Sequence, residues 1–252
     1  MRARRLIATG MAVLATAVGA GCSAAAGEPI AVSPVSRPPA TIPADPVAAL
    51  AAAKARLGTE SARFAQDDGG PRHLGFTGVA NAETHNWEIT AKEYVVRRVG
   101  TDLYIQASGE ILESMMLPAE TTDRLAAGGW VHTRLPNGRE LSAVFNDKFP
   151  WNLANAVTLA TGVIRISDRS FAGKIPGAAK PGSPPAARKD LRLSADLDEQ
   201  GRFTKISVSA DPSHGTVFTF SDFGVRADIT APPPGEVAEE ENPSFTASLP
   251  LY

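Results

Sequence analysis

The chain has 252 residues, of which 43% are hydrophobic, and a formal net charge of −2. Its single cysteine, Cys22, excludes an intramolecular disulfide. The slightly acidic balance, without a cluster of lysine and arginine, argues against a nucleic-acid-binding surface. About 170 residues lie between the terminal segments, which is enough for one domain with a sizeable core.

The N-terminus has the layout of a secretory signal. Three arginines lie within Met1–Arg5 without an acidic residue, and Leu6–Val18 is apolar and uncharged. Small residues at 19–21 then provide a cleavage site. Because the apolar run is shorter than the roughly 20 residues needed to cross a bilayer, we expect residues 1–21 to be a cleaved signal peptide. Its removal leaves 22 basic and 27 acidic residues.

Cys22 directly follows this signal and resembles the cysteine of a lipobox, which is diacylated and becomes the new N-terminus. One position departs from the pattern, because Gly19 stands where leucine is usual. The alternative is ordinary cleavage within Ser23–Ala26, with Cys22 a chance thiol. We favour the lipoprotein interpretation, in which acyl chains anchor the protein to the extracytoplasmic face of the cell membrane. The pair Arg4-Arg5 leaves twin-arginine export open beside the general secretory route.

The mature sequence divides by composition. Residues 22–45 are rich in Ala, Pro and Ser and predict a flexible tether behind the lipidated cysteine. Residues 46–237 carry the helix and strand signals and predict the folded domain, with a Pro/Gly-rich surface loop at 173–188. Residues 238–252 open on a run of glutamates and predict a disordered tail.

The domain begins with a helix and continues as a meander of strands. Asp45 and Pro46 start the predicted helix, which has Leu50 and Leu57 near one face and stops at Gly58. The hydrophobic period then changes to two, which is typical of antiparallel strands joined by short turns. The predicted strands are residues 61–66, 74–80, 86–91, 93–99 and 103–106.

The middle of the chain inserts helices before the strands resume. Residues 118–125 and 150–161 predict two helices, and strand fragments at 130–135 and 140–144 flank the turn Asn137-Gly138. The later predicted strands are residues 163–171, 190–197, 203–209, 217–220 and 225–229. Runs of strands with inserted helices indicate an α+β fold, in which helices cover one face of an antiparallel sheet.

The sequence lacks the constellation of side chains that an enzyme needs. No nucleophile elbow or phosphate-binding loop is present. The four histidines are scattered without metal-ligand spacing, at His73, His85, His132 and His214. We therefore expect no enzymatic activity, no metal and no cofactor.

Two acidic groups predict turns. Asp67-Asp68-Gly69-Gly70 lacks the ligand spacing of a calcium loop and predicts a hairpin turn. Asp196, Asp198 and Glu199 precede Gly201 and predict the solvated end of the clearest hairpin in the chain.

Three segments in a fixed order resemble a known family. They are Val99-Gly100-Thr101-Asp102-Leu103-Tyr104, the hairpin Leu197–Arg202, and Phe220-Ser221-Asp222-Phe223-Gly224. With the lipidated N-terminus and the tether, they resemble the actinobacterial LppX/LprG group of lipoproteins, whose fold is similar to that of the carriers LolA and LolB. The resemblance covers roughly residues 46–237. It implies a curved, antiparallel half-barrel sheet with two to three helices across its concave face, and no catalytic activity.

The resemblance also implies an apolar cavity for acyl chains between helices and sheet. Burial of hydrocarbon provides about 0.8 kcal/mol per methylene, so such a cavity needs no polar site. Candidate lining residues follow from their positions on the predicted elements: Trp87, Ile89, Leu103, Ile105, Leu112, Met115, Met116, Trp130, Phe145, Trp151, Val157 and Leu159. Met115 and Met116 suit varied chains because thioethers adapt their shape. The alternative for each residue is an ordinary core position.

We therefore predict a monomeric envelope lipoprotein that binds the acyl chains of a lipid or glycolipid, for transport or presentation. A second hypothesis is a non-enzymatic interaction or sensing module of the same fold, with a closed core and an envelope protein as its partner. An apolar tunnel between helices and sheet favours the first function, and a filled interior favours the second.

Overall fold

The computed structural model describes residues 38–67, 75–134, 149–177, 189–211 and 214–249. The chain divides into two compact units, 1–36 and 37–252, and every described residue belongs to the second. This unit contains its whole described hydrophobic core, so we expect it to fold without residues 1–36. Cys22 and the signal lie outside the described residues, as do Phe145, the Asn137-Gly138 turn and the predicted strand at 140–144.

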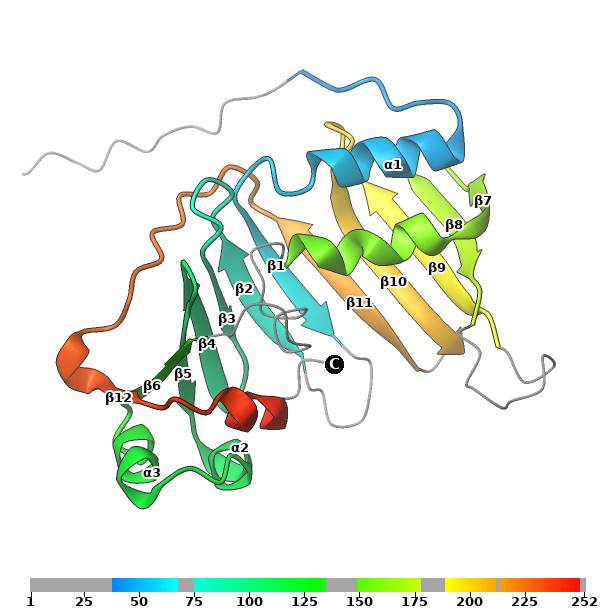
Figure 1. Cartoon of the computed structure of the whole chain (residues 1–252). Helices are drawn as coiled ribbons and strands as arrows, with labels where there is room; N and C mark the ends of the chain where they lie inside the picture. The colour runs from blue at the N-terminus through cyan, green and yellow to red at the C-terminus, as the bar shows by residue number, and fades with distance from the viewer. Residues whose placement is uncertain (1–37, 68–74, 135–148, 178–188, 212–213, 250–252) are drawn as a thin grey trace, which may run out of the picture. The chain divides into compact units, whose positions relative to one another are not determined.

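The described strands form one curved, unclosed 12-stranded sheet (Figure 1). In chain order the strands are β1 (Ala62–Asp67), β2 (Phe76–Ala80), β3 (Trp87–Thr90), β4 (Tyr94–Val99), β5 (Asp102–Ala107), β6 (Trp130–Arg134), β7 (Thr161–Arg165), β8 (Ser170–Ile175), β9 (Leu191–Leu197), β10 (Phe203–Asp211), β11 (His214–Ser221) and β12 (Val237–Glu239). Their order across the sheet is β12-β6-β5-β4-β3-β2-β1-β11-β10-β9-β8-β7. This arrangement confirms the predicted α+β class.

Two meanders make up the sheet, and β1 joins them. β1 pairs with β2, its neighbour in sequence, and on its other side with β11, where Phe64 lies opposite Phe220. Among the described strands, every pairing is antiparallel except that of β12, which lies parallel to β6. The sheet therefore depends on a contact between the beginning and the end of the domain.

The helices lie in two groups. α1 (Pro46–Arg56) and the 3₁₀ helix η1 (Trp151–Leu159) pack on each other and cross the second meander, while α2 (Gly109–Ser114) and α3 (Ala119–Ala126) lie at the end of the first (Figure 1). Asp45 caps α1 by accepting a hydrogen bond from the Ala48 amide, as predicted. The helix predicted at 150–161 is a 3₁₀ helix rather than an α-helix.

Two predicted strands differ from the structure. The single strand predicted at 163–171 is two strands, because residues 166–169, with the polar run Ser167-Asp168-Arg169, make the turn between β7 and β8. The strand predicted at 225–229 is absent; its carbonyls at Ala227 and Ile229 instead accept hydrogen bonds from the side chains of Asn81 and Asn86.

The tail predicted to be disordered from residue 238 is ordered in the structure as far as Leu249. It contributes β12, and the 3₁₀ helix η4 (Pro243–Ser248) follows. Phe245 and Leu249 are buried in the core cluster, so apolar burial outweighs the polar composition that suggested disorder.

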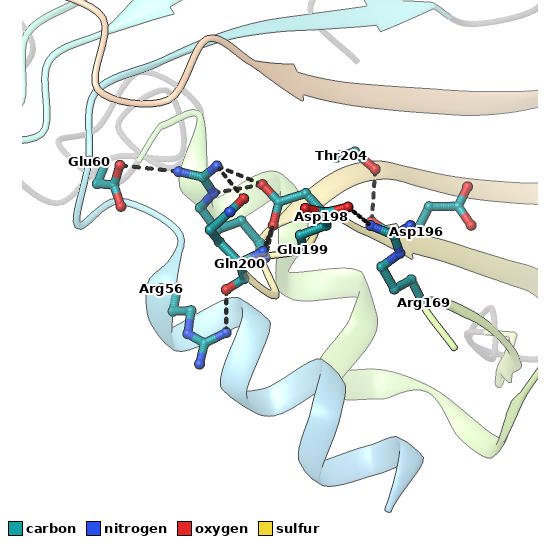
Figure 2. A network of polar contacts seen from close by, with 9 residues as sticks. Arg56, Glu60, Arg169, Asp196, Asp198, Glu199, Gln200 and Thr204 are labelled. Carbon is teal, nitrogen blue, oxygen red and sulfur yellow. Dashed lines mark hydrogen bonds and ion pairs between the residues drawn. The ribbon is translucent and has the colours of Figure 1, made fainter. Parts of the chain in front are cut away.

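A network of charged side chains fastens α1 to the turn between β9 and β10 (Figure 2). Asp198 accepts hydrogen bonds from the backbone amides of Gln200 and Arg202, each at 2.9 Å. Its second carboxylate oxygen lies 2.7 Å from Nη2 of Arg202. The other terminal nitrogen of Arg202, Nη1, lies 3.3 Å from the carboxylate of Glu60. From the helix, Arg56 donates to the carbonyl of Gln200 at 2.6 Å.

The hairpin end predicted to be solvated is therefore partly buried. The side chains of Asp198 and Arg202 are 19% and 16% exposed. At Gly201, φ is +70°, a conformation that favours glycine, and an added Cβ would also displace Nη1 of Arg56. The hairpin closes on the helix rather than pointing into solvent.

Replacement of Arg202 by methionine should lower the free energy of unfolding by about 2 kcal/mol, because two partly buried carboxylates would lose their partner. Urea denaturation measures the change. The matched control is Arg63→Met, which removes an ion pair whose side chains are 59% and 62% exposed and should cost less than about 0.5 kcal/mol. Equal losses in the two variants would contradict a structural role of the Arg202 network.

Candidate functional site

The apolar space between helices and sheet is the candidate site, and four of the predicted lining residues meet there. Trp87 and Ile89 of β3 lie on the same inner face as Leu103 and Ile105 of β5, and Val96 of β4 lies between them. All five side chains are 0% exposed. No void large enough for a water molecule therefore touches them.

The other predicted lining residues divide between core and surface. Leu112, Met115 and Val157 are buried in the same core cluster, and Trp151 packs against it half-buried. Met116 and Leu159 point to solvent, with 90% and 63% of their surface exposed. The prediction that Met116 and Leu159 line the interior is therefore wrong.

Trp130 lies on the opposite face of the sheet. Val131 and Thr133 of the same strand face inward beside Ile105 and Leu103, so strand alternation turns Trp130 outward. The guanidinium of Arg97 lies over its indole, 4.8 Å from the ring centre. The prediction that Trp130 faces the cavity is therefore wrong.

Phe149 is the residue of the interior that the sequence did not predict. Its ring lies 4.8 Å from Trp87 and 5.6 Å from Phe64, and it also contacts Phe76 at 6.3 Å, centre to centre. Phe149 precedes η1 in a segment without strand or helix period, so only its aromatic character could have marked it. This cluster fills the space above β1, β2 and β3.

The interior holds few polar groups. Among the described residues, the buried polar side chains are Gln66, Thr121, Thr133 and Thr246. The Thr133 hydroxyl has no hydrogen-bond partner in the described part of the chain. Burial raises the pKa of Tyr94 to about 12, so its phenol stays neutral. Among the described residues, this interior is therefore lined almost entirely by apolar side chains.

Polar side chains of the sheet lie on its outer face. A hollow of about 380 Å³ opens there over β1, β2, β3 and β11, lined by residues that include Arg63, Thr77, Gly78 and Glu88. Within the described ranges, no three acidic, histidine or cysteine side chains are placed to hold a metal ion. No described helix is long and apolar enough to span a membrane.

On this outer face, His132 of β6 links the edge strand β12 to β5. Its Nδ1 lies 2.5 Å from Glu239 of β12, and its Nε2 lies 3.1 Å from Asp102 of β5. Asp102 also accepts a hydrogen bond from Arg134 at 3.2 Å, and Tyr104 stacks on the imidazole. Burial opposes ionisation of Asp102, but the hydrogen bonds from His132 and Arg134 outweigh it and lower its pKa.

Comparison with solved structures shows a distant likeness to a lipoprotein. No family model and no curated protein matches the chain. Among solved structures, the crystal structure of the Mycobacterium tuberculosis lipoprotein LppX covers 73% of this chain and 98% of that chain, with 13% identity and a TM-score of 0.40. LppX is a member of the group that the sequence resembles, but a likeness this distant assigns no function.

Truncation of Leu103 to alanine should cost about 2–5 kcal/mol of stability, because a filled interior cannot close around the lost atoms. Thermal or urea unfolding measures the loss. Met116→Ala, at an exposed position, should change stability by less than about 0.5 kcal/mol. A loss below about 1 kcal/mol for Leu103→Ala would show that the interior is open to solvent rather than packed.

The stability contributed by Asp102 should depend on pH. Since its pKa is lowered in the folded protein, its contribution is present above the ordinary carboxyl pKa and is lost as the pH falls through the folded-state value. Asp102→Asn should therefore be less stable than the wild-type protein at pH 7, and the difference should shrink toward about pH 3. Urea unfolding across this range measures it, and a constant difference would contradict the assignment.

Proposed function

We propose that this protein is a lipoprotein of the cell envelope that binds acyl chains of lipids or lipidated molecules between its helices and its sheet, for transport or presentation. Cys22 is the proposed lipidation site, and the tether allows the domain to reorient above the membrane. The ligand site is proposed to run along the inner face of the sheet, from the space beneath η1 to Trp87, Ile89, Leu103 and Ile105, with Phe149, which precedes η1 and contacts Trp87, between the two parts.

One observation carries this proposal: an interior of almost only apolar side chains is covered over the second meander by α1 and a 3₁₀ helix. η1 runs over nine residues, and 3₁₀ hydrogen bonds have poorer geometry than those of an α-helix. Displacing η1 therefore costs less than displacing an α-helix of the same length. An acyl chain that takes its place keeps the inner face dry, because hydrocarbon replaces hydrocarbon.

The contact between η1 and α1 supports the same route. Gly58, with a φ of +87°, ends the segment after α1, and an added Cβ there would lie 3.0 Å from the indole of Trp151. Trp151 thus rests on a surface that only glycine leaves open. Movement of this indole off Gly58 would open the space beneath η1.

The closed interior favours a second candidate function. With Trp87, Ile89, Leu103 and Ile105 fully buried, the described conformation offers no room for a ligand beside them. A module with a permanently filled core would instead bind an envelope protein through its surface. Stable capture of one protein partner at fixed stoichiometry, without bound lipid, would favour this function.

Quenching by a brominated fatty acid should locate the acyl chain, because bromine quenches tryptophan fluorescence only at contact. The chain has three tryptophans, and Trp87 lies inside while Trp130 lies on the outer face. With residues 37–252 and dibromostearate, we expect strong quenching in the wild-type protein and in Trp130→Phe. In Trp87→Phe the quenching should fall markedly.

Native mass spectrometry of the same protein supplies the second readout, with co-purified or added lipid expected at one or more copies. Quenching that survives in Trp87→Phe but disappears in Trp130→Phe would place the fatty acid on the outer face. No quenching and no bound lipid would rule out the proposed site and leave the closed module as the better account.

A further inference from the structure

Exposed aliphatic side chains gather at one edge of the sheet. Five large hydrophobic residues stand out as exposed in the described part of the chain, and Met116 lies at the far end of the domain from the other four. These four are Val47, Leu159, Ile164 and Ile166, each between 57% and 63% exposed. They lie on β7, on the turn after it, and on the ends of α1 and η1 nearest to it. We name this group the β7 edge.

Exposed basic side chains flank the β7 edge. Lys174 of β8 and Arg192 of β9 lie directly opposite each other on the outer face, both exposed. Like charges in register destabilise a sheet. Neither makes an ion pair with any described residue, and Lys189, also exposed, lies just before β9. Asp190 offsets only one of these three charges.

Ile164 shares the outer face of the sheet with the basic groups, while Val47 and Leu159 border the same edge from the helices on the inner side. Ile164 lies opposite Ala172, two residues before Lys174 on the same side of β8. The outer face thus presents, from the edge inward, an isoleucine, a lysine and an arginine on successive strands. Aliphatic side chains beside a cluster of positive charge match a bilayer surface that contains anionic lipids.

Strand addition by a second copy does not account for this edge. β7 carries a bulge between Thr161 and Ile164, and Gly162 within it has a φ of +58°. Bulges of this kind break the regular ladder that another strand would need. The bulge protects this edge from strand pairing, so no added strand covers Ile164 and Ile166.

The N-terminal segment joins the domain beside the same edge. The guanidinium of Arg165 on β7 donates hydrogen bonds to the carbonyls of Pro43 and Ala44, directly before α1. Cys22 lies sixteen residues before Pro38, where the described chain begins, a length of at most about 55 Å when extended. An anchor at Cys22 can therefore hold the β7 edge against the membrane.

We propose that the β7 edge is a docking surface for an anionic phospholipid membrane. The four aliphatic side chains reach into the acyl region, while Lys174, Lys189 and Arg192 contact the headgroup phosphates. This inference rests on the envelope location in the proposed function. It concerns the membrane surface rather than the single lipid held inside, so the two can fail separately.

Vesicle flotation tests the docking surface, with residues 37–252 so that neither signal peptide nor lipid anchor contributes. The protein should bind vesicles of phosphatidylcholine and phosphatidylglycerol in equal amounts, and bind pure phosphatidylcholine weakly. Lys174→Glu combined with Arg192→Glu should lower the partition coefficient at least about tenfold, since each basic residue near such a surface contributes about fivefold. Ile164→Ser combined with Ile166→Ser should also lower it about tenfold.

The controls match these changes in charge and polarity elsewhere on the domain. Lys92→Glu with Arg226→Glu alters the charge by the same amount at two exposed positions, and Met116→Ser removes the fifth exposed hydrophobic side chain. Both controls should bind like the wild-type protein. Equal losses in control and edge variants, or no binding to the anionic vesicles, would overturn the proposal.

Two further measurements separate membrane docking from self-association and from lipid binding in the interior. Sedimentation without vesicles should give a monomer, and a dimer that Ile164→Ser/Ile166→Ser dissociates would assign the edge to a second copy instead. Fatty-acid quenching of Trp87 should persist in the edge variants. If the wild-type protein bound vesicles but showed no fatty-acid quenching of Trp87, the internal lipid site would be contradicted and the docking surface would be retained.

Discussion

The need to keep one face of a 12-stranded sheet out of water governs the rest of this structure. Nearly every inward side chain is aliphatic or aromatic, yet among the described elements only α1, η1 and four shorter helices are available to cover them. Single side chains from short or irregular segments cover the rest of the inner face. Phe149 closes the space over the first three strands, and Phe245 and Leu249 return from the C-terminal segment to complete the core. This layer over the inner face is thin, and η1 is its least regular helix.

Local patterns in the sequence predicted most of this sheet. The period of two located the strands of both meanders, and the inward positions of Trp87, Ile89, Leu103 and Ile105 followed from it. These residues lie in uninterrupted strands, where alternation fixes the face. The errors lie where a partner far away in the sequence decides the outcome.

Three residues show why local sequence patterns do not predict contacts with distant partners. Trp130 is apolar and buried, but Arg97 two strands away covers it on the outer face. Asp198 looks like a solvated turn residue until Arg56 and Glu60, more than a hundred residues earlier, close over the hairpin. Phe245 follows a run of glutamates, and only the completed sheet provides the apolar surface that buries it. Composition describes a segment, whereas burial depends on what the fold brings to it.

The interior and the β7 edge suggest two distinct relations to lipid. An apolar interior under a 3₁₀ helix that can be displaced suits a single chain withdrawn from water, and an aliphatic edge beside exposed basic residues suits the surface from which such a chain would come. Arg165 joins the two, because it ties the segment before α1 to β7 while lying 4.8 Å from the ring centre of the buried Phe171.

The pairing of β1 with β11 also determines the order in which the chain can fold. Roughly 150 residues separate Phe64 from Phe220, and closing a loop of that length is slow because the entropy is lost before the contacts form. Each meander can form hairpins early, but the sheet becomes continuous only after β11 is available. A chain that emerges N-terminus first would thus keep one edge of β1 unpaired until β11 has followed. Until then, the first meander exposes an open strand edge that is available for pairing with another chain.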